Sequence, residues 1–277
     1  YFHQNHYKMK KLFLLPFAFI VFLLNGCMHT KKSTASSLSF APNIVVAHRG
    51  AWKKHNLPEN SIASLKEAVR IGCTGSEFDV HLTADDSLVV NHDPHYAGLT
   101  IEKSTYAELA TTKLSNGEML PTVYNYLQAG MQQTKTMLVL EIKPSTISKE
   151  RGQYLAEKVV ALVKQLKAEP WIMYISFDYD ILKKVLELQP GAKTAYLNGE
   201  KSPEQLAADK IWGADYHYNV FKKNNQWIAD AQKLGINLNA WTVNNAEDMQ
   251  WFINNKFDYI TTNEPELLFD ILNKKGR

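Results

Sequence analysis

The sequence is poor in cysteine, in net charge and in long apolar runs. Its 277 residues contain two cysteines, Cys27 and Cys73, and carry a formal net charge of +3. Two cysteines exclude a small fold held together by several disulfides. No internal repeat is visible. The composition, 45% hydrophobic and 21% charged, favours one large α/β domain over two small ones.

The first residues have the pattern of an export signal rather than of a folded domain. A lysine-rich start is followed by an apolar run over 12–24 and a small residue before Cys27. This run is shorter than the ~20 apolar residues that a membrane-spanning helix needs, and the pattern is typical of a signal peptide. Residues 24–27, Leu-Asn-Gly-Cys, resemble a bacterial lipoprotein cleavage box, which implies cleavage before Cys27 and lipid on its sulfur. Met9 is then the expected start.

Removal of this leader changes the charge balance. Residues 1–26 contain three lysines at positions 8, 10 and 11 and no acid, so the charge of +3 becomes 3 − 3 = 0. A neutral protein lacks the clustered cations that nucleic acid requires, so we expect no nucleic-acid partner. With Cys27 lipidated, Cys73 has no partner for an internal disulfide, and we expect it to be buried filler rather than a nucleophile.

The expected domain organisation has three parts. Residues 1–26 are the leader and lipoprotein signal peptide. Residues 27–42, polar and small, are the lipidated cysteine and a flexible tether. Residues 43–277 are the folded domain. We expect a protein exported and anchored by lipid to the bacterial cell envelope, on the periplasmic or the outer-membrane face, with no obligate protein partner evident.

Short β-rich runs alternate with helical spacing along the domain, which indicates a parallel sheet, either closed as an eight-stranded barrel or open and doubly wound. The runs are 44–47, 77–81, 88–91, 137–142, 172–176, 194–197, 215–218, 238–243 and 259–261. Nine runs are one too many for a barrel. However, the second and third are separated only by polar turn residues around Asp85 and Asp86, which predicts a hairpin. The prediction is therefore a (β/α)8 barrel with a β-hairpin extension at residues 77–92. If Asp85 and Asp86 are the two turn residues, Asp79 faces His92.

Acidic side chains in this hairpin point to a metal. Glu77, Asp79 and His81 share one face of their strand, because side chains alternate. Two inward carboxylates are costly without a cation between them. Glu141 lies among apolar residues of the next barrel strand in the same way. Three carboxylates can bind one divalent cation, and oxygen ligands favour calcium or magnesium.

Six short motifs together resemble the glycerophosphodiester phosphodiesterase family, in its bacterial lipoprotein form. The motifs, in order, are His48-Arg49-Gly50, Pro58-Glu59-Asn60, Glu77-Phe78-Asp79, His92-Asp93-Pro94, Leu140-Glu141-Ile142-Lys143 and Trp241-Thr242-Val243-Asn244. The resemblance covers the domain from Ile44 to about Leu272. It implies a barrel with metal-dependent hydrolysis of glycerophosphodiesters to glycerol phosphate and an alcohol.

By this likeness His48 and His92 are the general acid and base, in an order that the sequence leaves open, and Glu77, Asp79 and Glu141 bind the metal. The attacking oxygen is water or the neighbouring glycerol hydroxyl.

Other polar residues of the motifs have expected supporting roles. Arg49 and Lys143 suit phosphate oxygens, and Trp241 is expected to contact the glycerol at the rim. Glu59 and Asn60 support the site or only cap the helix that follows, with Asn60 as its N-cap. His81 is expected to hydrogen-bond behind the ligands rather than to bind metal.

Two other functions stay open at this point. The first is a phospholipase-type barrel, D-like or C-like, that acts on intact phospholipids and would have an exposed apolar rim. The second is a non-catalytic lipoprotein that binds a phosphorylated ligand.

Overall fold

A computed structural model describes residues 1–4 and 38–275 of the chain. All helices and strands of the described residues belong to one compact unit within residues 36–277. The predicted lipidation at Cys27 lies outside the described residues, as do positions 5–26 of the leader and 27–37 of the tether. Among the described helices, none has both the length and the apolar character required to cross a membrane.

Eight parallel strands close into a barrel, as predicted. They follow the order β1-β11-β10-β9-β8-β7-β6-β2, and β1 also pairs with β2, which closes the sheet. The strands are β1 Val45–Ala47, β2 Gly75–Leu82, β3 Leu88–Val90, β4 His95–Tyr96, β5 Leu99–Thr100, β6 Met137–Ile142, β7 Ile172–Ser176, β8 Thr194–Tyr196, β9 Gly213–His217, β10 Asn237–Trp241 and β11 Tyr259–Thr262. All nine predicted runs occur as strands.

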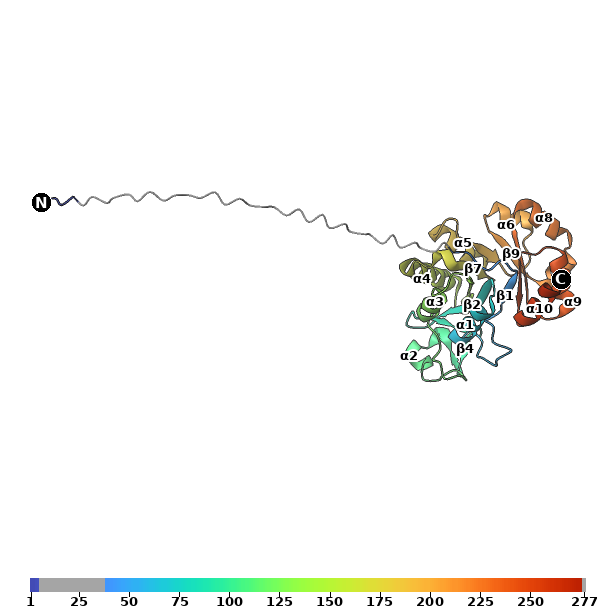
Figure 1. The fold of residues 1–277 in the computed structure, drawn as a ribbon, viewed down its shortest axis with the longest axis horizontal. Coiled ribbons are helices and arrows are strands. Elements are labelled where there is room, and N and C mark those ends of the chain that lie inside the picture. The colour runs from blue at the N-terminus through green and yellow to red at the C-terminus, as the bar shows by residue number, and fades with distance from the viewer. Residues whose placement is uncertain (5–37, 276–277) are drawn as a thin grey trace, which may run out of the picture. The chain divides into compact units, whose positions relative to one another are not determined.

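Helices connect successive barrel strands and cover the outside of the sheet (Figure 1). The α-helices are α1 Ile62–Ile71, α2 Tyr106–Leu109, α3 Val123–Gly130, α4 Lys149–Leu166, α5 Tyr179–Leu188, α6 Pro203–Ala208, α7 Tyr218–Lys223, α8 Gln226–Leu234, α9 Ala246–Asn254 and α10 Pro265–Lys275. Two short 3-10 helices span Ile101–Lys103 and Glu169–Trp171. In Figure 1, α5 lies beside β7, and α6 lies beside β9.

Alternation along the strands separates the inside of the barrel from the helix layer. On β6, Met137 and Val139 pack inside the barrel, whereas Leu138 and Leu140 pack toward helices. Glu141 continues the inward series at the carboxyl end of the strand. Active sites of such barrels form at this end, so the fold places the acidic residues where a site is expected.

The hairpin of β2 and β3 is present, but its predicted register was wrong by one residue. His81 pairs with Val89, so the Asp79 backbone faces Asn91, whose N–H donates to the Asp79 carbonyl at 3.1 Å. The prediction assumed a two-residue turn. Instead, Thr83 closes a longer loop by exchanging hydrogen bonds with Ser87, and its hydroxyl accepts the Ser87 N–H at 2.9 Å. His92 therefore lies beyond the end of β3.

Candidate active site

Three carboxylates meet at the carboxyl ends of β2 and β6. Asp79 and Glu141 are neighbours in the register of the two strands. Glu77, Asp79 and Glu141, here called the carboxylate cluster, are 1–7% exposed, and one ligand oxygen from each lies within 4.8 Å of the others. Burial, together with the charge of Asp79, raises the pKa of Glu77 well above its usual value and that of Glu141 to about 8. Burial alone would raise the pKa of Asp79 too, but Lys143 and other partners lower it to about 2.

The carboxylate cluster has the donor set of a hard divalent cation. Oxygen donors of this kind suit calcium or magnesium. Glu77 Oε1 is buried and has no hydrogen-bond partner among the described residues, which suits an atom that ligates a cation. The raised pKa values of Glu77 and Glu141 have the same physical origin, because three close anions in a buried site cannot all ionise cheaply. The three residues therefore fit the predicted metal site.

Two cations face the carboxylate cluster. Lys143 Nζ lies 2.8 Å from Glu141 Oε1 and 3.1 Å from Asp79 Oδ1. These acids overcome the effect of burial and raise the pKa of Lys143. Arg49 Nη1 pairs with Glu59 Oε2 at 2.5 Å, and its Nε lies 3.8 Å from Asp79 Oδ2. Arg49 Nε is buried without a hydrogen-bond partner among the described residues, so this donor is available to an anion.

The turn after β1 fixes the main chain of Arg49. Arg49 and Gly50 both have positive φ, 57° and 80°. This turn directs the Arg49 N–H at Glu77 Oε2, 2.8 Å away. A Cβ at position 50 would lie 2.4 Å from the Ser64 hydroxyl, so only glycine fits here. The sequence His-Arg-Gly therefore brings the Arg49 main chain to an acid of the carboxylate cluster.

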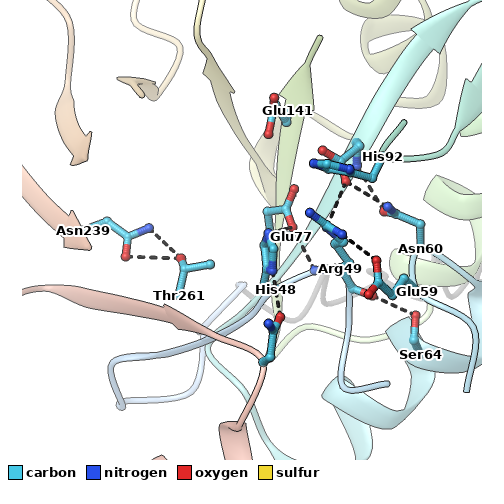
Figure 2. A network of polar contacts seen from close by, with 12 residues as sticks. His48, Arg49, Glu59, Asn60, Ser64, Glu77, His92, Glu141, Asn239 and Thr261 are labelled. Atoms are coloured by element: carbon cyan, nitrogen blue, oxygen red, sulfur yellow. Dashed lines mark hydrogen bonds and ion pairs between the residues drawn. The ribbon is translucent and has the colours of Figure 1, made fainter. Parts of the chain in front are cut away.

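Asn60 orients Asp79 and does not cap the helix. Its Nδ2 donates to Asp79 Oδ2 at 2.8 Å, and its Oδ1 accepts the Asp79 N–H at 3.1 Å. The expected cap at Asn60 was wrong by one residue, because Ser61 caps α1 by accepting the Ser64 N–H. Asn60 is 3% exposed and has a φ of 59°. Figure 2 shows Asn60 and Glu59 on the side of Glu77 where Arg49 lies.

The two motif histidines border the same cleft in different surroundings. Nδ1 of His48 lies 2.7 Å from Asn263 Oδ1, and Nε2 lies 3.9 Å from Glu77 Oε2. Burial and the charge of Arg49 lower the pKa of His48 to about 4. The His92 side chain is 39% exposed, and its Nδ1 lies 2.7 Å from Asp93 Oδ1. His81 Nε2 contacts the His92 carbonyl at 3.2 Å and is not part of the carboxylate cluster.

Six of these residues line a cleft of about 490 Å³, namely His48, Arg49, Glu77, His92, Glu141 and Lys143. Trp241 lines it from β10, which lies across the closed barrel from β2 and β6. The Trp241 indole N–H donates to the Asp215 carbonyl at 2.8 Å, and its ring packs edge-on against Phe177. Sequence reasoning missed several lining residues, namely Ile175, Phe177, Leu197, Asp215, Thr242 and Thr261. Inward alternation on β9 would have identified Asp215, because this carboxylate lies two positions before His217 in a strand with an apolar outer face.

Comparison with known proteins gives the family. A sequence model described as the glycerophosphoryl diester phosphodiesterase family matches residues 48–267. A relative named glycerophosphodiester phosphodiesterase, from Caldanaerobacter subterraneus subsp. tengcongensis, is 32% identical over 248 residues, covering 84% of this chain and 99% of the relative.

Solved structures of similar proteins have the same barrel. The crystal structure of a glycerophosphodiester phosphodiesterase from Parabacteroides distasonis is 41% identical, with a TM-score of 0.82 over 86% of this chain and 100% of that chain. A phosphodiesterase from Oleispira antarctica, solved in complex with the product sn-glycerol-3-phosphate, shares the fold at 24% identity, with a TM-score of 0.70 over 83% and 97% of the chains. The chain belongs to the glycerophosphoryl diester phosphodiesterase family of enzymes.

Proposed function

We propose that this protein hydrolyses glycerophosphodiesters to glycerol phosphate and an alcohol, with one divalent cation and two histidines. The observation that carries the proposal is the convergence of three kinds of group in one cleft. Two acids of the carboxylate cluster, Glu77 and Glu141, border it together with two cationic side chains and two histidines. Family membership supports the reaction class.

The carboxylate cluster would hold the cation, calcium or magnesium. Such an ion polarises a phosphoryl oxygen and offsets the charge that develops on it. Asn60 supports this role by fixing the Asp79 carboxylate from both sides, because partners behind the ligands set ligand orientation. His81 contributes further back, where its ring contacts the main chain that carries His92.

Arg49 and Lys143 would bind the anionic phosphodiester. Arg49 is held by Glu59 through Nη1, which leaves the unpartnered Nε beside Asp79 as a donor for a phosphate oxygen. Lys143, fully charged beside two acids, adds a positive point charge. Donors fixed before the substrate arrives stabilise developing negative charge without further rearrangement.

The two histidines have different surroundings, which suit one to accept a proton and the other to donate one. The low pKa of His48 keeps its ring neutral at pH 7, and Asn263 Oδ1 accepts from Nδ1–H, so Nε2 carries the lone pair of a general base. His92 lies at the open mouth, where its Nδ1 contacts the Asp93 carboxylate, and Nε2 of the ring that carries both protons would donate one to the departing alcohol. Each transfer typically contributes 10²–10⁴-fold in rate.

The proposed hydrolysis is a displacement at phosphorus. An oxygen of water or of the neighbouring glycerol hydroxyl forms a bond to phosphorus and loses its proton to His48. The bond from phosphorus to the head-group oxygen breaks, and His92 protonates that oxygen. Attack by the glycerol hydroxyl would give a cyclic phosphate that a water molecule then opens, and ³¹P NMR would detect this intermediate during turnover.

Location is a separate proposal that rests on the sequence. We propose that the chain is exported and attached to the cell envelope by lipid on Cys27. Incorporation of a radiolabelled fatty acid into the expressed protein, lost in Cys27→Ala, is the expected result. Equal labelling of both proteins would contradict the anchor.

The experiment for the reaction measures glycerol phosphate release from glycerophosphocholine and glycerophosphoethanolamine with calcium, magnesium or a chelator. Activity that depends on the cation and falls at least 10²-fold in both His48→Ala and His92→Ala is expected. His55→Ala is the matched control, since His55 pairs with Glu67 away from the cleft and should leave activity unchanged. No release by the folded protein under any condition would refute the proposal, and release from intact phospholipids instead would favour the phospholipase reading.

A further inference from the structure

The wall of the cleft opposite the carboxylate cluster contains a buried acid that the proposed reaction does not use. Asp215 on β9 lies next to Asn239 on β10 in the register of the strands. Asn239 in turn donates to the Thr261 hydroxyl on β11 at 2.9 Å. These three side chains, here called the polar row, lie inside the barrel, and Figure 2 shows Asn239 and Thr261 on the other side of Glu77 from Arg49 and Asn60.

Asp215 lacks the partners that a buried carboxylate normally has. It is 1% exposed and lines the cleft, and its Oδ1 has no hydrogen-bond partner among the described residues. No described cation forms an ion pair with it, and its neighbour Asn239 offsets the effect of burial on its pKa only in part. An unpaired buried polar atom costs free energy. Its position on the cleft indicates that the missing partner is a ligand.

The direction of the proposed reaction indicates which part of the substrate reaches Asp215. This step rests on the proposed function. His92, the group that protonates the leaving alcohol, lies at the open mouth, so the head group leaves there. The part that stays on phosphorus, glycerol, would then extend away from this mouth toward the buried lining residues, which include Asp215 and Thr261.

We propose that Asp215 is a specificity-determining residue that binds the hydroxyl groups of the glycerol moiety. Hydroxyls suit this site better than a cationic head group. Burial raises the pKa of Asp215 to about 7, so both protonation states are populated near neutrality. A hydroxyl can donate to the ionised form or accept from the protonated form, whereas an ammonium requires the ionised one. Trp241 and Phe177 offer apolar faces to the glycerol carbons.

The test compares substrates that differ in hydroxyls with substrates that differ in head-group charge. Full-length wild type, Asp215→Ala and Asp215→Asn are assayed on glycerophosphocholine, glycerophosphoglycerol and propylphosphocholine, which lacks the hydroxyls. In Asp215→Ala we expect kcat/KM to fall about 10–100-fold on both glycerol substrates and to change little on the propyl compound. Asp215→Asn keeps one acceptor oxygen and should lose less. Asp230→Ala, an acid on α8 that contacts Gln226, is the control and should match wild type.

A binding measurement tests the role of Asp215 independently of the proposed reaction, because it needs no turnover. Calorimetry compares glycerol phosphate with propyl phosphate, and Asp215→Ala should lose the preference for glycerol phosphate. Equal losses of kcat/KM on all three substrates would overturn the proposal. A loss of kcat/KM confined to the two substrates with the charged choline head group would overturn it too. If the wild type releases no glycerol phosphate, the proposed function fails, and an unchanged binding preference in Asp215→Ala would then overturn the role of Asp215 as well.

Discussion

Asp215 should make the folded protein less stable as pH rises, and Asp215→Asn should remove this effect. The carboxylate is buried inside the barrel, and burial raises its pKa from 3.8 to about 7, with Asn239 opposing the shift only in part. In the unfolded chain the group ionises near its ordinary pKa. Between the two values the folded protein binds a proton that the unfolded chain has released.

The sign and magnitude follow from this difference in bound protons. Where the folded state binds more protons, stability falls with rising pH by about 1.4 kcal/mol per pH unit. For Asp215 this loss begins near pH 4 and ends just above pH 7. Between pH 5 and pH 8 the single carboxylate should therefore lower the free energy of unfolding by about 2.5 kcal/mol. An asparagine at this position has no proton to release and should show no such loss.

Urea unfolding of wild type and Asp215→Asn at pH 5 and pH 8 measures the effect. The stability difference between the two proteins should shift by about 2.5 kcal/mol in favour of the variant at the higher pH. Other titrating groups, including the carboxylate cluster, are present in both proteins and cancel in this difference. Asp230→Asn, which removes a less buried acid on α8, should track wild type at both pH values. A difference that is the same at pH 5 and pH 8 would refute the reasoning, because the buried carboxylate would then not have a raised pKa.

Three further perturbations test the cation site, the residue that supports Asp79 and the turn after β1. Asn60→Ala removes both hydrogen bonds to Asp79 and should weaken calcium or magnesium binding about 10–100-fold in calorimetry; unchanged affinity would mean that Asp79 needs no support. Gly50→Ala should destabilise the fold by about 2–3 kcal/mol more than Gly117→Ala. Both glycines have positive φ, but only at position 50 would the new Cβ clash, 2.4 Å from the Ser64 hydroxyl, and equal urea midpoints would contradict this. A divalent cation at a hundred times its dissociation constant should stabilise the protein by about 2.7 kcal/mol, a rise of roughly 5–10 °C in Tm, which a chelator reverses; no rise with either metal would contradict the cation site.

The barrel could be predicted from the sequence because its strands have strong local signals. Runs such as 137–142 and 172–176 are β-rich, bounded by helical spacing, and fully buried in the structure. The order strand, helix, strand then leaves few topologies. The strands β4 and β5 were missed, since two residues each are too few to show alternation.

Two predictions, the register of the hairpin and the N-cap of α1, were wrong by one residue. In both places hydrogen bonds of side chains decide the local structure. The hairpin register depended on turn length, and the Thr83 hydroxyl stabilises a longer loop than the pattern of acids suggested. Asn60 and Ser61 are both good helix caps in isolation. The long-range contact of Asn60 with Asp79 decided between them, and no local pattern encodes that contact. Asp215 is a different case, because alternation along β9 places it inside the barrel, and only the closure of the barrel shows that it lines the cleft.

The charges around the cleft indicate that the cation site and the phosphate-binding residues depend on each other. When ionised, the carboxylate cluster and Glu59 carry four negative charges, and Arg49 and Lys143 carry two positive ones, so the described groups sum to −2. With all four acids ionised, such a site would repel an anionic phosphodiester. A bound divalent cation would bring the sum to zero and would favour ionisation of Glu77 and Glu141, whose pKa values are otherwise raised. Arg49 and Lys143 alone cannot neutralise the four acids, since each of these cations is already paired with an acid. Substrate binding should therefore depend on the cation even in variants whose histidines are removed, which separates electrostatic attraction of the phosphate from proton transfer to and from it.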